Sequence, residues 1–366
     1  MSKKTVALIG YGNIGHSWEP AIRQHPDWEL VAIVDSNTEL LENVPNMGIG
    51  ISGDQTFTSI TECVKAGVKP DLAIVAIPIY YHHQVTREVM DLDINVICEK
   101  NMASTLYFGR QMVQLAKDKP HLCTAIDTQY RYMGSYWTAH QFFKQEKNPI
   151  GTLGLMKWES QDFRTDIVAR PWWYAQPDIY LEDMSIHWFD LMRFTTGLDI
   201  VQVKADVIRP KYSTWQGSTD IHASLALAKP EDYNDHHNWV WCHFYGGFKR
   251  GGPTHNEFVY YGRDGQAKIV DTGMEIKLYP DKSDTRKVEE DGYLGIDAGP
   301  VLGTPYSGHT AMLETMSRAI DSGGVEQPPT NFCEAFKSFA VTVACSESSR
   351  YNKTVWVPEY WNGLLD

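Results

Sequence analysis

The sequence predicts an α/β protein with a doubly wound parallel sheet at its start and a second, α+β domain after it. Three observations predict this fold class. Short apolar runs alternate with helical patterns over roughly the first third of the chain, a glycine-rich loop follows the first run, and alternating strand-like runs dominate after Gly151. We expect the first domain to span residues 1–127 and the second residues 128–366, with the last helices as candidates to pack back on the first domain.

The bulk properties of the chain bound what it can do. Its 366 residues, 43% of them hydrophobic, exceed what one core comfortably holds and suit two domains. The formal net charge of −13 argues against nucleic acid or an anionic membrane as a partner. No apolar run reaches about 18 residues, and Met1–Lys4 leads directly into a strand, so we expect a cytoplasmic protein.

The cysteines and histidines predict neither disulfides nor a metal centre. Six cysteines are scattered without a CxxC pair and are interpreted as reduced packing residues: Cys63, Cys98, Cys123, Cys242, Cys333 and Cys345. His236, His237 and His243, with Asp235, fit no compact zinc spacing. We interpret them as a polar loop that enters an edge strand.

The first apolar run and the loop after it form the most specific motif. Thr5–Ile9 is typical of a buried strand, and Gly10, Gly12 and Gly15 follow it. In such a loop the first glycine permits a tight turn, the second lets the backbone approach a pyrophosphate, and the third lets the helix pack closely on the strand. The next helix would direct its unpaired N–H groups at that pyrophosphate. The motif therefore predicts dinucleotide binding in a Rossmann fold.

Asp35 indicates which dinucleotide is bound. It ends the apolar run Leu30–Val34, twenty residues beyond Gly15, where an acidic side chain accepts hydrogen bonds from the adenosine ribose. Ser36 and Asn37 follow it, so no arginine or lysine stands beside it to pair with a 2′-phosphate. The sequence therefore predicts NAD rather than NADP. The alternative is that Asp35 only caps the next helix.

The rest of the first domain continues the alternation. Apolar runs predict strands at 71–77, 95–98 and 121–125. Helical patterns lie at 38–43, 59–66, 83–90 and 105–117. Because ligands bind beyond the carboxyl ends of parallel strands, the side chains at those ends are expected to form one line of sites. They are Asp35, Pro78, Glu99, Lys100 and Gln129.

The second domain is predicted to hold a large open, mainly antiparallel sheet. Strand-like runs lie at 152–159, 201–208, 222–228, 239–245, 257–261, 267–270 and 275–279. Turns such as Arg263-Asp264-Gly265 join them. One helix, at 181–196 and closed by Gly197, interrupts the strands, and two more follow at 309–322 and 332–350.

An ordered set of motifs resembles the glucose-fructose oxidoreductase/inositol dehydrogenase/MocA (Gfo/Idh/MocA) family. The motifs are the glycine loop 10–15, Asp35, Ile77-Pro78 with His82 four residues beyond the proline, Glu99-Lys100, Gly151, and Asp183-x-x-x-His187-x-x-Asp190 followed by Gly197. The set covers nearly the whole chain in the right order. Two departures stand out: Asn101 follows the lysine where the family usually has proline, and Tyr180-Leu181-Glu182 replaces the glycines that commonly precede the aspartate.

The resemblance implies a two-domain NAD(P)-dependent oxidoreductase of sugars or cyclitols, usually a dimer or tetramer built through the open sheet of the second domain. It makes Lys100, Asp183 and His187 the expected catalytic residues. Trp172-Trp173 resembles an aromatic segment near the nicotinamide. We therefore expect NAD as the cofactor, a small sugar or glycoside as the substrate, and a homodimer or higher homo-oligomer.

The motifs and the resemblance give candidate binding residues for the cofactor and for the substrate. For the cofactor they are Gly10, Gly12, Asn13, Ile14, Gly15, Asp35, Ser36, Ile77, Pro78, His82, Glu99, Lys100, Gln129 and Trp172. For the substrate they are Lys100, Arg131, Tyr132, Trp173, Asp183, His187 and His309. No metal is expected.

The chemistry of alcohol oxidation assigns roles to the catalytic candidates. The O–H proton must leave while the C–H hydride goes to the nicotinamide. Histidine titrates nearest neutrality, so His187 is the natural general base. Asp183 shares its helix face and can bind a neighbouring hydroxyl, while Asp190 either orients the imidazole or holds the helix against the first domain. Lys100 can donate to the reacting oxygen. The alternatives are a surface lysine and a solvated helix face.

Aromatic residues crowd into the segment that leads to the helix at 181–196. They are Trp158, Phe163, Trp172, Trp173, Tyr174, Tyr180 and Trp188. Such rings stack on sugars and aryl groups, or they fill a core. Taken together they favour a substrate larger than a free polyol. Within the family this favours oxidation at C3 of an O- or C-glucoside, with NAD that stays bound and is recycled.

Other functions stay open. An inositol or aldose dehydrogenase would use the same mechanism, and a 3-keto sugar reductase would run it in reverse. A non-catalytic NAD-binding sensor would keep the fold but predicts loss of Lys100 or His187, and both are present.

Overall fold

The computed structural model describes residues 3–145, 148, 150–163, 176–249, 254–270, 275–280, 294–295 and 307–365. The chain divides into two compact units. The first holds residues 1–129, 306–336 and 363–366, and the second holds residues 130–305 and 337–362. The first unit is therefore assembled from separate stretches of the chain.

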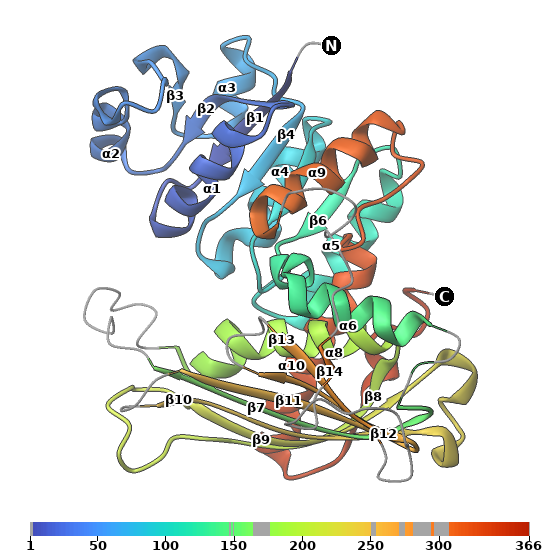
Figure 1. Cartoon of the computed structure of the whole chain (residues 1–366). Helices are drawn as coiled ribbons and strands as arrows, with labels where there is room; N and C mark the ends of the chain where they lie inside the picture. Colours follow the sequence, from blue (N-terminus) through green and yellow to red (C-terminus); the bar gives the residue numbers. More distant parts are fainter. Residues whose placement is uncertain are drawn as a thin grey trace. The chain divides into compact units, whose positions relative to one another are not determined.

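The first unit contains a six-stranded parallel sheet in the order β3-β2-β1-β4-β5-β6 (Figure 1). Its strands are β1 (Lys4–Ile9), β2 (Trp28–Val34), β3 (Thr56–Phe57), β4 (Leu72–Val75), β5 (Asn95–Cys98) and β6 (Thr124–Ile126). The strand order reverses between β1 and β4, as in a Rossmann fold. Strand β4 is buried along its whole length, as expected of a parallel sheet with helices on both faces. The predicted doubly wound sheet is confirmed.

Side-chain caps fix where several helices of this unit begin. The crossover helices are α1 (Asn13–Gln24), α2 (Thr38–Asn43), α3 (Ile60–Lys65), α4 (His82–Asp91) and α5 (Leu106–Asp118). Asn37, Ser59 and Thr105 each accept a hydrogen bond from the backbone N–H three residues on, at the starts of α2, α3 and α5. These local signals explain why the sequence locates the three helices within a residue or two.

A later stretch of the chain completes the first unit. Helix α9 (Gly308–Asp321) contributes Leu313, whose carbonyl accepts from the Trp28 indole at 3.2 Å. Beyond α9, the Thr330 carbonyl accepts from the Ile126 N–H of β6 at 2.9 Å. The core of the first unit thus includes residues that follow strands β7 to β14 of the large sheet in sequence.

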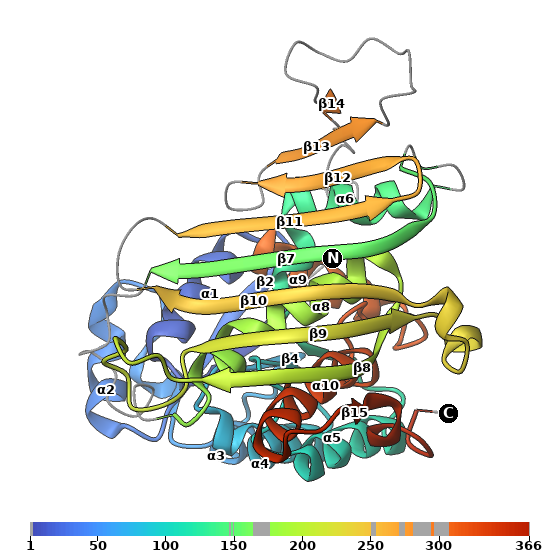
Figure 2. The ribbon, with the colours of Figure 1, turned by 90° about the horizontal axis from the view of Figure 1, so that it is seen from below.

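The second unit is built on a nine-stranded sheet in the order β14-β13-β12-β11-β7-β10-β9-β8-β15 (Figure 2). Its strands are β7 (Leu153–Phe163), β8 (Asp199–Ile208), β9 (Asp220–Ala228), β10 (Val240–Lys249), β11 (His255–Gly262), β12 (Gly265–Val270), β13 (Glu275–Pro280), β14 (Leu294–Gly295) and β15 (Val355–Trp356). Only β7 and β10 pair in parallel among these neighbours, so the predicted mainly antiparallel sheet is confirmed. Since β10 lies between β7 and β9, the expectation that His236 and His237 precede an edge strand is wrong.

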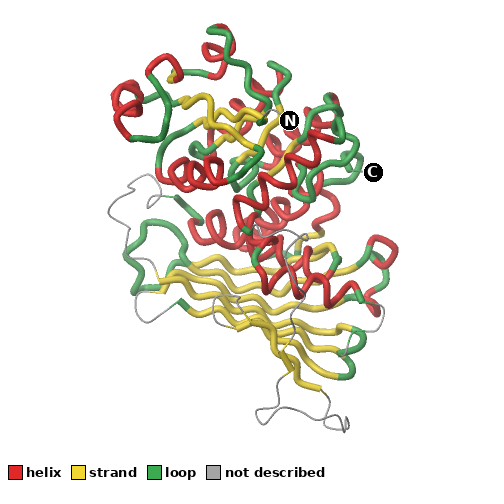
Figure 3. Tube along the Cα trace, turned by 45° about the horizontal axis from the view of Figure 1, so that its top comes forward, coloured by secondary structure: helices red, strands yellow, loops and turns green. Residues whose placement is uncertain are grey.

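Helices cover one face of this sheet (Figure 3). They are α6 (Gly134–Lys144), α8 (Ile186–Thr196) and the part of α10 (Phe332–Tyr351) that belongs to the second unit. The rings of Trp188 and Phe189 on α8 meet Phe258 and Phe244 of the sheet at centroid distances of 5.2 and 5.4 Å. Trp158 stacks on Phe258 at 4.2 Å. This aromatic layer is the core of the second unit.

Two helical features of the second unit differ from expectation. Helix α6 was not predicted, because its aromatic and small residues show only a weak helical period. The predicted helix at 181–196 begins as a π-helical turn, η6 (Leu181–Ser185), and continues as α8. In the part of the chain that the structure describes, no helix has the length and apolar character needed to cross a bilayer.

The cysteines sit among packed side chains. All six are free, and only Cys333 among them is not fully buried. Burial raises the pKa of Cys63 and of Cys123 to about 11, so these thiols stay protonated near neutral pH.

The three glycines after β1 differ in whether the fold leaves space for a side chain. Gly10 has φ +89°, and a Cβ there would lie 2.4 Å from the Ala76 carbonyl oxygen. A Cβ on Gly15 would lie 2.3 Å from the Gly10 carbonyl oxygen. A Cβ on Gly12 would meet nothing within 4 Å. Packing therefore requires Gly10 and Gly15, whereas the fold leaves space beside Gly12.

We expect Gly15→Ala to destabilise the first unit by about 1–3 kcal/mol, because the new methyl group must displace backbone. Gly12→Ala is the matched control and should change stability by less, since its methyl group enters open space. Thermal unfolding of the two variants checks this. A larger loss for Gly12→Ala than for Gly15→Ala would contradict the assignment.

Candidate functional site

The loop before α1 offers a site for an anion. Gly12 is the N-cap of α1 and has no side chain that could cap it, and the first turn of the helix holds no acidic residue. Asn13 and Ile14, the first two residues of the helix, are exposed. With the open space beside Gly12, this end of the helix fits a pyrophosphate, which its dipole and N–H groups would stabilise.

Asp35 lies at the carboxyl end of β2 and is held by backbone. One carboxylate oxygen accepts from the Tyr11 N–H at 2.8 Å, and the other from the Asn37 N–H at 2.9 Å. Asn37, not Asp35, caps α2 through the Leu40 N–H. The capping alternative is therefore not what the structure shows. Asp35 is only half-buried, so its remaining lone pairs can accept ribose hydroxyls.

His82 joins the ends of two strands. Its ring is buried, with Nδ1 2.7 Å from the Asn101 carbonyl oxygen and Nε2 2.8 Å from the Ile77 carbonyl oxygen. Burial lowers the pKa of His82. The contacts tie the segment after β4, where Pro78 precedes a short 3₁₀ turn, to the residue that follows Lys100. His82 therefore supports the backbone around the half-buried Lys100.

Glu99 belongs to a buried cluster rather than to the surface. The Trp18 indole donates to one of its oxygens at 2.8 Å. His309 Nε2 lies 3.0 Å from Asp127 Oδ2, and its ring stacks on Trp18 at 4.1 Å. These four side chains come from α1, the end of β5, the end of β6 and the start of α9. They join the carboxyl edge of the sheet to α9.

The ionisable groups of this cluster shift one another. Burial, then repulsion by Asp127 and a hydrogen bond shared with it, raises the pKa of Glu99 to about 8. Burial disfavours the charged form of His309, but Asp127 and Glu99 outweigh it and raise the pKa of the imidazole. The raised pKa of Glu99 favours its neutral form near neutral pH, and the raised pKa of His309 favours an ion pair with Asp127.

The second unit carries the other catalytic candidates. Asp183 lies in the π-helical turn η6, is half-buried, and is followed by the buried His187 in α8. Residues four apart in an α-helix are offset by about 40° around the axis. The π-helical turn holds Asp183 and runs directly into α8, which holds His187, so the two residues lie four apart in one continuous helical segment and share a face. Such turns occur frequently at functional sites.

The 3₁₀ turn η4 (Gln129–Tyr132) packs on this helix. The Tyr130 ring stacks on the His187 ring, with centroids 4.2 Å apart and planes inclined by 16°. Next to it, Arg131 Nε and Nη2 donate to the two oxygens of Asp190 at 2.5 and 2.6 Å. Arg131 and Tyr132 are both buried. The guanidinium expected to bind substrate is thus engaged with Asp190 inside the unit.

The role of Asp190 becomes clear from its partners. Burial favours its neutral form, yet Arg131, Arg193 and Ser338 hold the pKa of Asp190 below the ordinary value. Arg131 and Ser338 both belong to the second unit, so within the described residues Asp190 anchors α8 to η4 and α10.

The remaining candidate residues either lie outside the described residues, fill the core, or are divided between the two units. Trp172, Trp173 and Tyr174, with the side chain of Phe163, lie outside the described residues. Trp158, Tyr180 and Trp188 are fully buried, so the core-filling alternative applies to them. Lys100 lies in the first unit, whereas Asp183 and His187 lie in the second.

Glu182 is an ionisable neighbour of Asp183 that sequence reasoning did not single out. Burial and the charge of Asp178 raise the pKa of Glu182 to about 7. Its only signal in the sequence is that it replaces a glycine expected before the aspartate.

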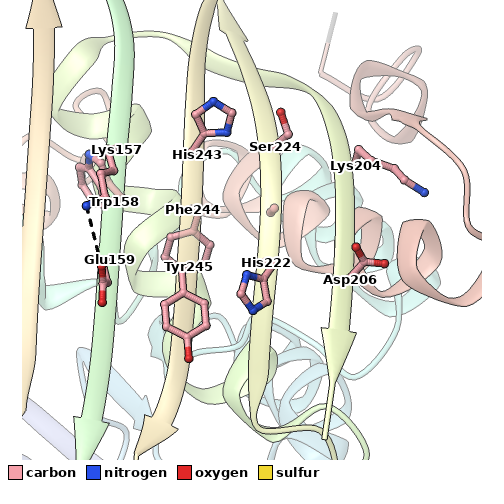
Figure 4. Close-up of a pocket in the computed structure, with 11 residues that line it drawn as sticks. Lys157, Trp158, Glu159, Lys204, Asp206, His222, Ser224, His243, Phe244 and Tyr245 are labelled. Atoms are coloured by element: carbon pink, nitrogen blue, oxygen red, sulfur yellow. Dashed lines mark ion pairs between the residues drawn. The ribbon is translucent and has the colours of Figure 1, made fainter. Parts of the chain in front are cut away.

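The face of the large sheet away from α6 and α8 holds an open pocket of about 380 Å³ (Figure 4). Its side chains form two cross-strand rows. One row contains Lys157, His243, Ser224 and Lys204, and the next contains Glu159, Tyr245, His222 and Asp206. A third, apolar row is formed by Tyr261, Leu155 and Trp241, each more than a third exposed. We call these three rows the outer face.

Metal-ligand side chains approach one another at two places in the described ranges. They are Glu99, Asp127 and His309, and His25, Asp27 and Glu314. His243 instead lies on the outer face, and Asp235 accepts from the His237 N–H at 3.1 Å to cap a 3₁₀ turn. The expected absence of a metal stays a prediction.

Comparison with known proteins links the first unit to a family. Residues 4–126 match the sequence profile of the Gfo/Idh/MocA oxidoreductase family, NAD-binding Rossmann fold. A curated relative, inositol 2-dehydrogenase 1 of Paenarthrobacter aurescens, is 22% identical over 59% of this chain. That match spans 60% of the relative's own length.

Solved structures resemble the whole chain. An oxidoreductase from Agrobacterium radiobacter, in complex with NAD+, L-tartaric acid and magnesium, has a TM-score of 0.81 at 18% identity, over 98% of this chain and 99% of that chain. Levoglucosan dehydrogenase in complex with NADH has a TM-score of 0.79 at 18% identity, over 98% of this chain and 100% of that chain. At such identities the likeness shows a shared fold.

The Glu99 cluster predicts a pH-dependent stability. Because the folded-state pKa of Glu99 is raised, the unfolded state loses its proton first, and stability should fall as pH rises from about 4.5 to about 8. Glu99→Gln removes this contribution, with a slope of at most about 1.4 kcal/mol per pH unit. Thermal unfolding midpoints between pH 5 and 8 should therefore fall less steeply for Glu99→Gln than for the wild type. If the midpoints of the wild type and of Glu99→Gln changed in parallel with pH, Glu99 would not hold its proton in the folded state. Glu326→Gln, at an exposed position, is the control.

Proposed function

We propose that this chain is an NAD(H)-dependent enzyme that oxidises a secondary hydroxyl of a sugar or glycoside, since residues 4–126 match the NAD-binding domain of the Gfo/Idh/MocA oxidoreductase family. The match confirms the family that the motifs resemble and the NAD-binding fold of the first unit. The curated relative is named an inositol dehydrogenase, and a structural neighbour is a levoglucosan dehydrogenase. Both names point to cyclic polyols as the substrate class.

The observation that carries the proposal is the position of Asp183 and His187, four residues apart in the continuous helical segment formed by η6 and α8, where they share a face. The proposed reaction needs one group that removes the hydroxyl proton and another that holds the ring. His187 takes the proton of the reacting hydroxyl, and Asp183 accepts a hydrogen bond from a neighbouring hydroxyl. This arrangement suits vicinal diols.

Lys100 is proposed to donate to the reacting oxygen and to stabilise the negative charge that develops on it. When bound, NAD accepts the hydride from the carbinol carbon. The proton that His187 takes and the hydride together account for the two hydrogens removed in oxidation. The contacts of His82 keep the backbone beside Lys100 in place during the reaction.

We further propose C3 of a glucoside as the favoured position, with NAD that stays bound and is recycled. The support is the family and the neighbour that acts on a sugar rather than an inositol. An inositol or aldose dehydrogenase is the alternative, and a 3-keto sugar reductase is the same chemistry reversed. A non-catalytic NAD-binding sensor is the alternative outside enzymes.

The outer face is proposed to be covered by a second copy of the chain. Its basic and acidic rows are adjacent, so two copies related by a two-fold axis can set each row of one against the opposite row of the other. The apolar row of Tyr261, Leu155 and Trp241 would be buried alongside.

The first test is activity. Purified protein should form NADH when given a glucoside, and its absorbance should show this without added NAD if the cofactor stays bound. His187→Ala and Lys100→Ala should lower turnover by about 10²–10⁴-fold. The control, His237→Ala in the loop before β10, should be unaffected.

Each outcome of this test decides between functions. NADH formation only with inositol or free sugar and added NAD would favour the dissociable-cofactor dehydrogenase. No hydride transfer with any polyol would favour the sensor. Normal turnover by both His187→Ala and Lys100→Ala would refute their catalytic roles.

A separate test concerns assembly. Leu155→Glu places a charge in the middle of the apolar row and should convert an oligomer to monomers, as measured by light scattering after size-exclusion chromatography. Tyr351→Glu, at a position that is 63% exposed on α10, is the control and should leave the mass unchanged. A wild-type monomer, or a Leu155→Glu oligomer of unchanged mass, would rule out this interface.

A further inference from the structure

The imidazole of His187 has an aromatic ring against its face. The Tyr130 and His187 rings are 4.2 Å apart and nearly parallel, at 16°. His187 is 3% exposed, whereas Tyr130 is half-buried. The two residues belong to the same compact unit, so the contact does not depend on how the units are arranged.

The backbone that presents Tyr130 is itself fixed to the helix that presents His187. The next residue, Arg131, forms a two-pronged hydrogen-bonded ion pair with Asp190, three residues after His187. The Arg131 guanidinium also lies over the Phe194 ring, 5.2 Å from its centroid, one turn further along α8. A buried ion pair of this geometry has few alternative arrangements. It therefore sets where Tyr130 meets the helix.

We propose that Tyr130 is a positioning residue for the reaction: its ring, held in place by the Arg131–Asp190 pair, fixes the plane of the His187 imidazole. This inference rests on the proposed function, in which His187 takes the hydroxyl proton. It assigns Arg131 an action through Asp190 and Tyr130 rather than on the substrate.

The physical reason is that proton transfer depends on direction. An imidazole nitrogen accepts a proton along a line in the plane of its ring, so rotation about the Cβ–Cγ bond turns that line away from the hydroxyl. Torsions of this type are broad and are not fixed by staggering alone. A ring stacked on one face makes such rotation unfavourable, because tilting the imidazole breaks the contact. The stacking contact is made by the ring of Tyr130, so the proposed restraint does not require its hydroxyl group.

The chain supplies a matched control on the same helix. His140 stacks on Phe194 at 4.0 Å and 16°, which is almost the same geometry, and its Nδ1 lies 2.6 Å from the Phe194 carbonyl oxygen. Removing the His140 side chain costs α8 a comparable packing contact, and in addition the hydrogen bond to the Phe194 carbonyl, without touching Tyr130 or His187. His140→Ala therefore reports what loss of packing alone does to turnover.

The test compares Tyr130→Phe, Tyr130→Leu, Tyr130→Ala and His140→Ala in the full-length protein. Tyr130→Ala and Tyr130→Leu should lower kcat by about 10²-fold with little change in KM for NAD, because a small misplacement of a catalytic group has effects of this size. Tyr130→Phe should keep most of the wild-type kcat, since it keeps the ring. His140→Ala should keep kcat even where it lowers the thermal midpoint.

A spectroscopic measurement separates positioning from general damage. In protein labelled at histidine carbons, the ring protons of His187, assigned by comparison with His187→Gln, should be shielded by the stacked Tyr130 ring. They should move downfield in Tyr130→Ala and Tyr130→Leu but not in Tyr130→Phe or His140→Ala. Tyr130→Leu retains bulk at the site, so it stays informative if Tyr130→Ala folds poorly.

The outcomes are decisive. Unchanged kcat in Tyr130→Leu, a loss of kcat equal in His140→Ala and Tyr130→Ala, or loss of kcat in Tyr130→Phe would overturn the proposal. Unmoved His187 resonances in Tyr130→Ala would overturn it as well. Normal turnover by His187→Ala would instead refute the proposed function, and the His187 resonances would still report whether Tyr130 stacks on the ring.

Discussion

Helix α8 is buried from Ile186 to Thr195, and the second unit is arranged around that fact. Two charged side chains, Asp190 and Arg193, point from this helix into an interior where an unpaired charge is costly. Ser338 joins them, since its hydroxyl donates to Asp190 at 2.9 Å and accepts from Arg193 at 2.8 Å. Arg193 also donates to Asp199 at the start of β8, at 2.8 Å. Four elements, η4, α8, α10 and β8, are thereby connected through one line of charges.

This line of charges limits how α8 can rotate or slide. An apolar helix in an apolar layer tolerates small shifts in register, whereas hydrogen-bonded ion pairs are satisfied at one register only. The π-helical turn η6, with its wider winding, ends before these charged residues begin. The helix is therefore fixed by its buried charges, while Asp183 lies in the turn ahead of them. Helix α8 thus provides the fixed part of this segment, and the turn η6 before it carries Asp183, a candidate catalytic residue.

Signals confined to a short stretch of sequence predicted much of the fold. The glycine loop, the strand ending at Asp35 and the caps Ser59 and Thr105 each act on residues within a turn or a strand of themselves. Helix α6 escaped prediction because its interior side chains are mostly aromatic and small, so no clear apolar stripe marks it. The π-helical turn escaped because five residues carry no periodicity that distinguishes it from an α-helix.

The candidate site was predictable only in part, because short sequence motifs mark some of its residues and not others. Motifs identified Asp183 and His187. No sequence signal near His187 predicts its contact with Tyr130, because that contact depends on the packing of η4 on α8. Asp127 and His309 are 182 residues apart, and their pairing depends on the return of the chain to the first unit. The burial of Trp158, on strand β7, and of Tyr180 likewise follows from the packing of the helices on the large sheet, which composition alone does not specify.

The return of the chain to the first unit also determines when the parts of that unit become available during synthesis. All six strands of the first sheet have been synthesised by Ile126, yet the carbonyl groups of Leu313 and Thr330 that complete their surroundings come nearly two hundred residues later. The nascent sheet must wait, with Trp28 and Ile126 lacking these partners, while the strands from β7 to β14 are made. Chaperone binding during synthesis should therefore concentrate on the N-terminal third of the chain, although that third is the first to leave the ribosome.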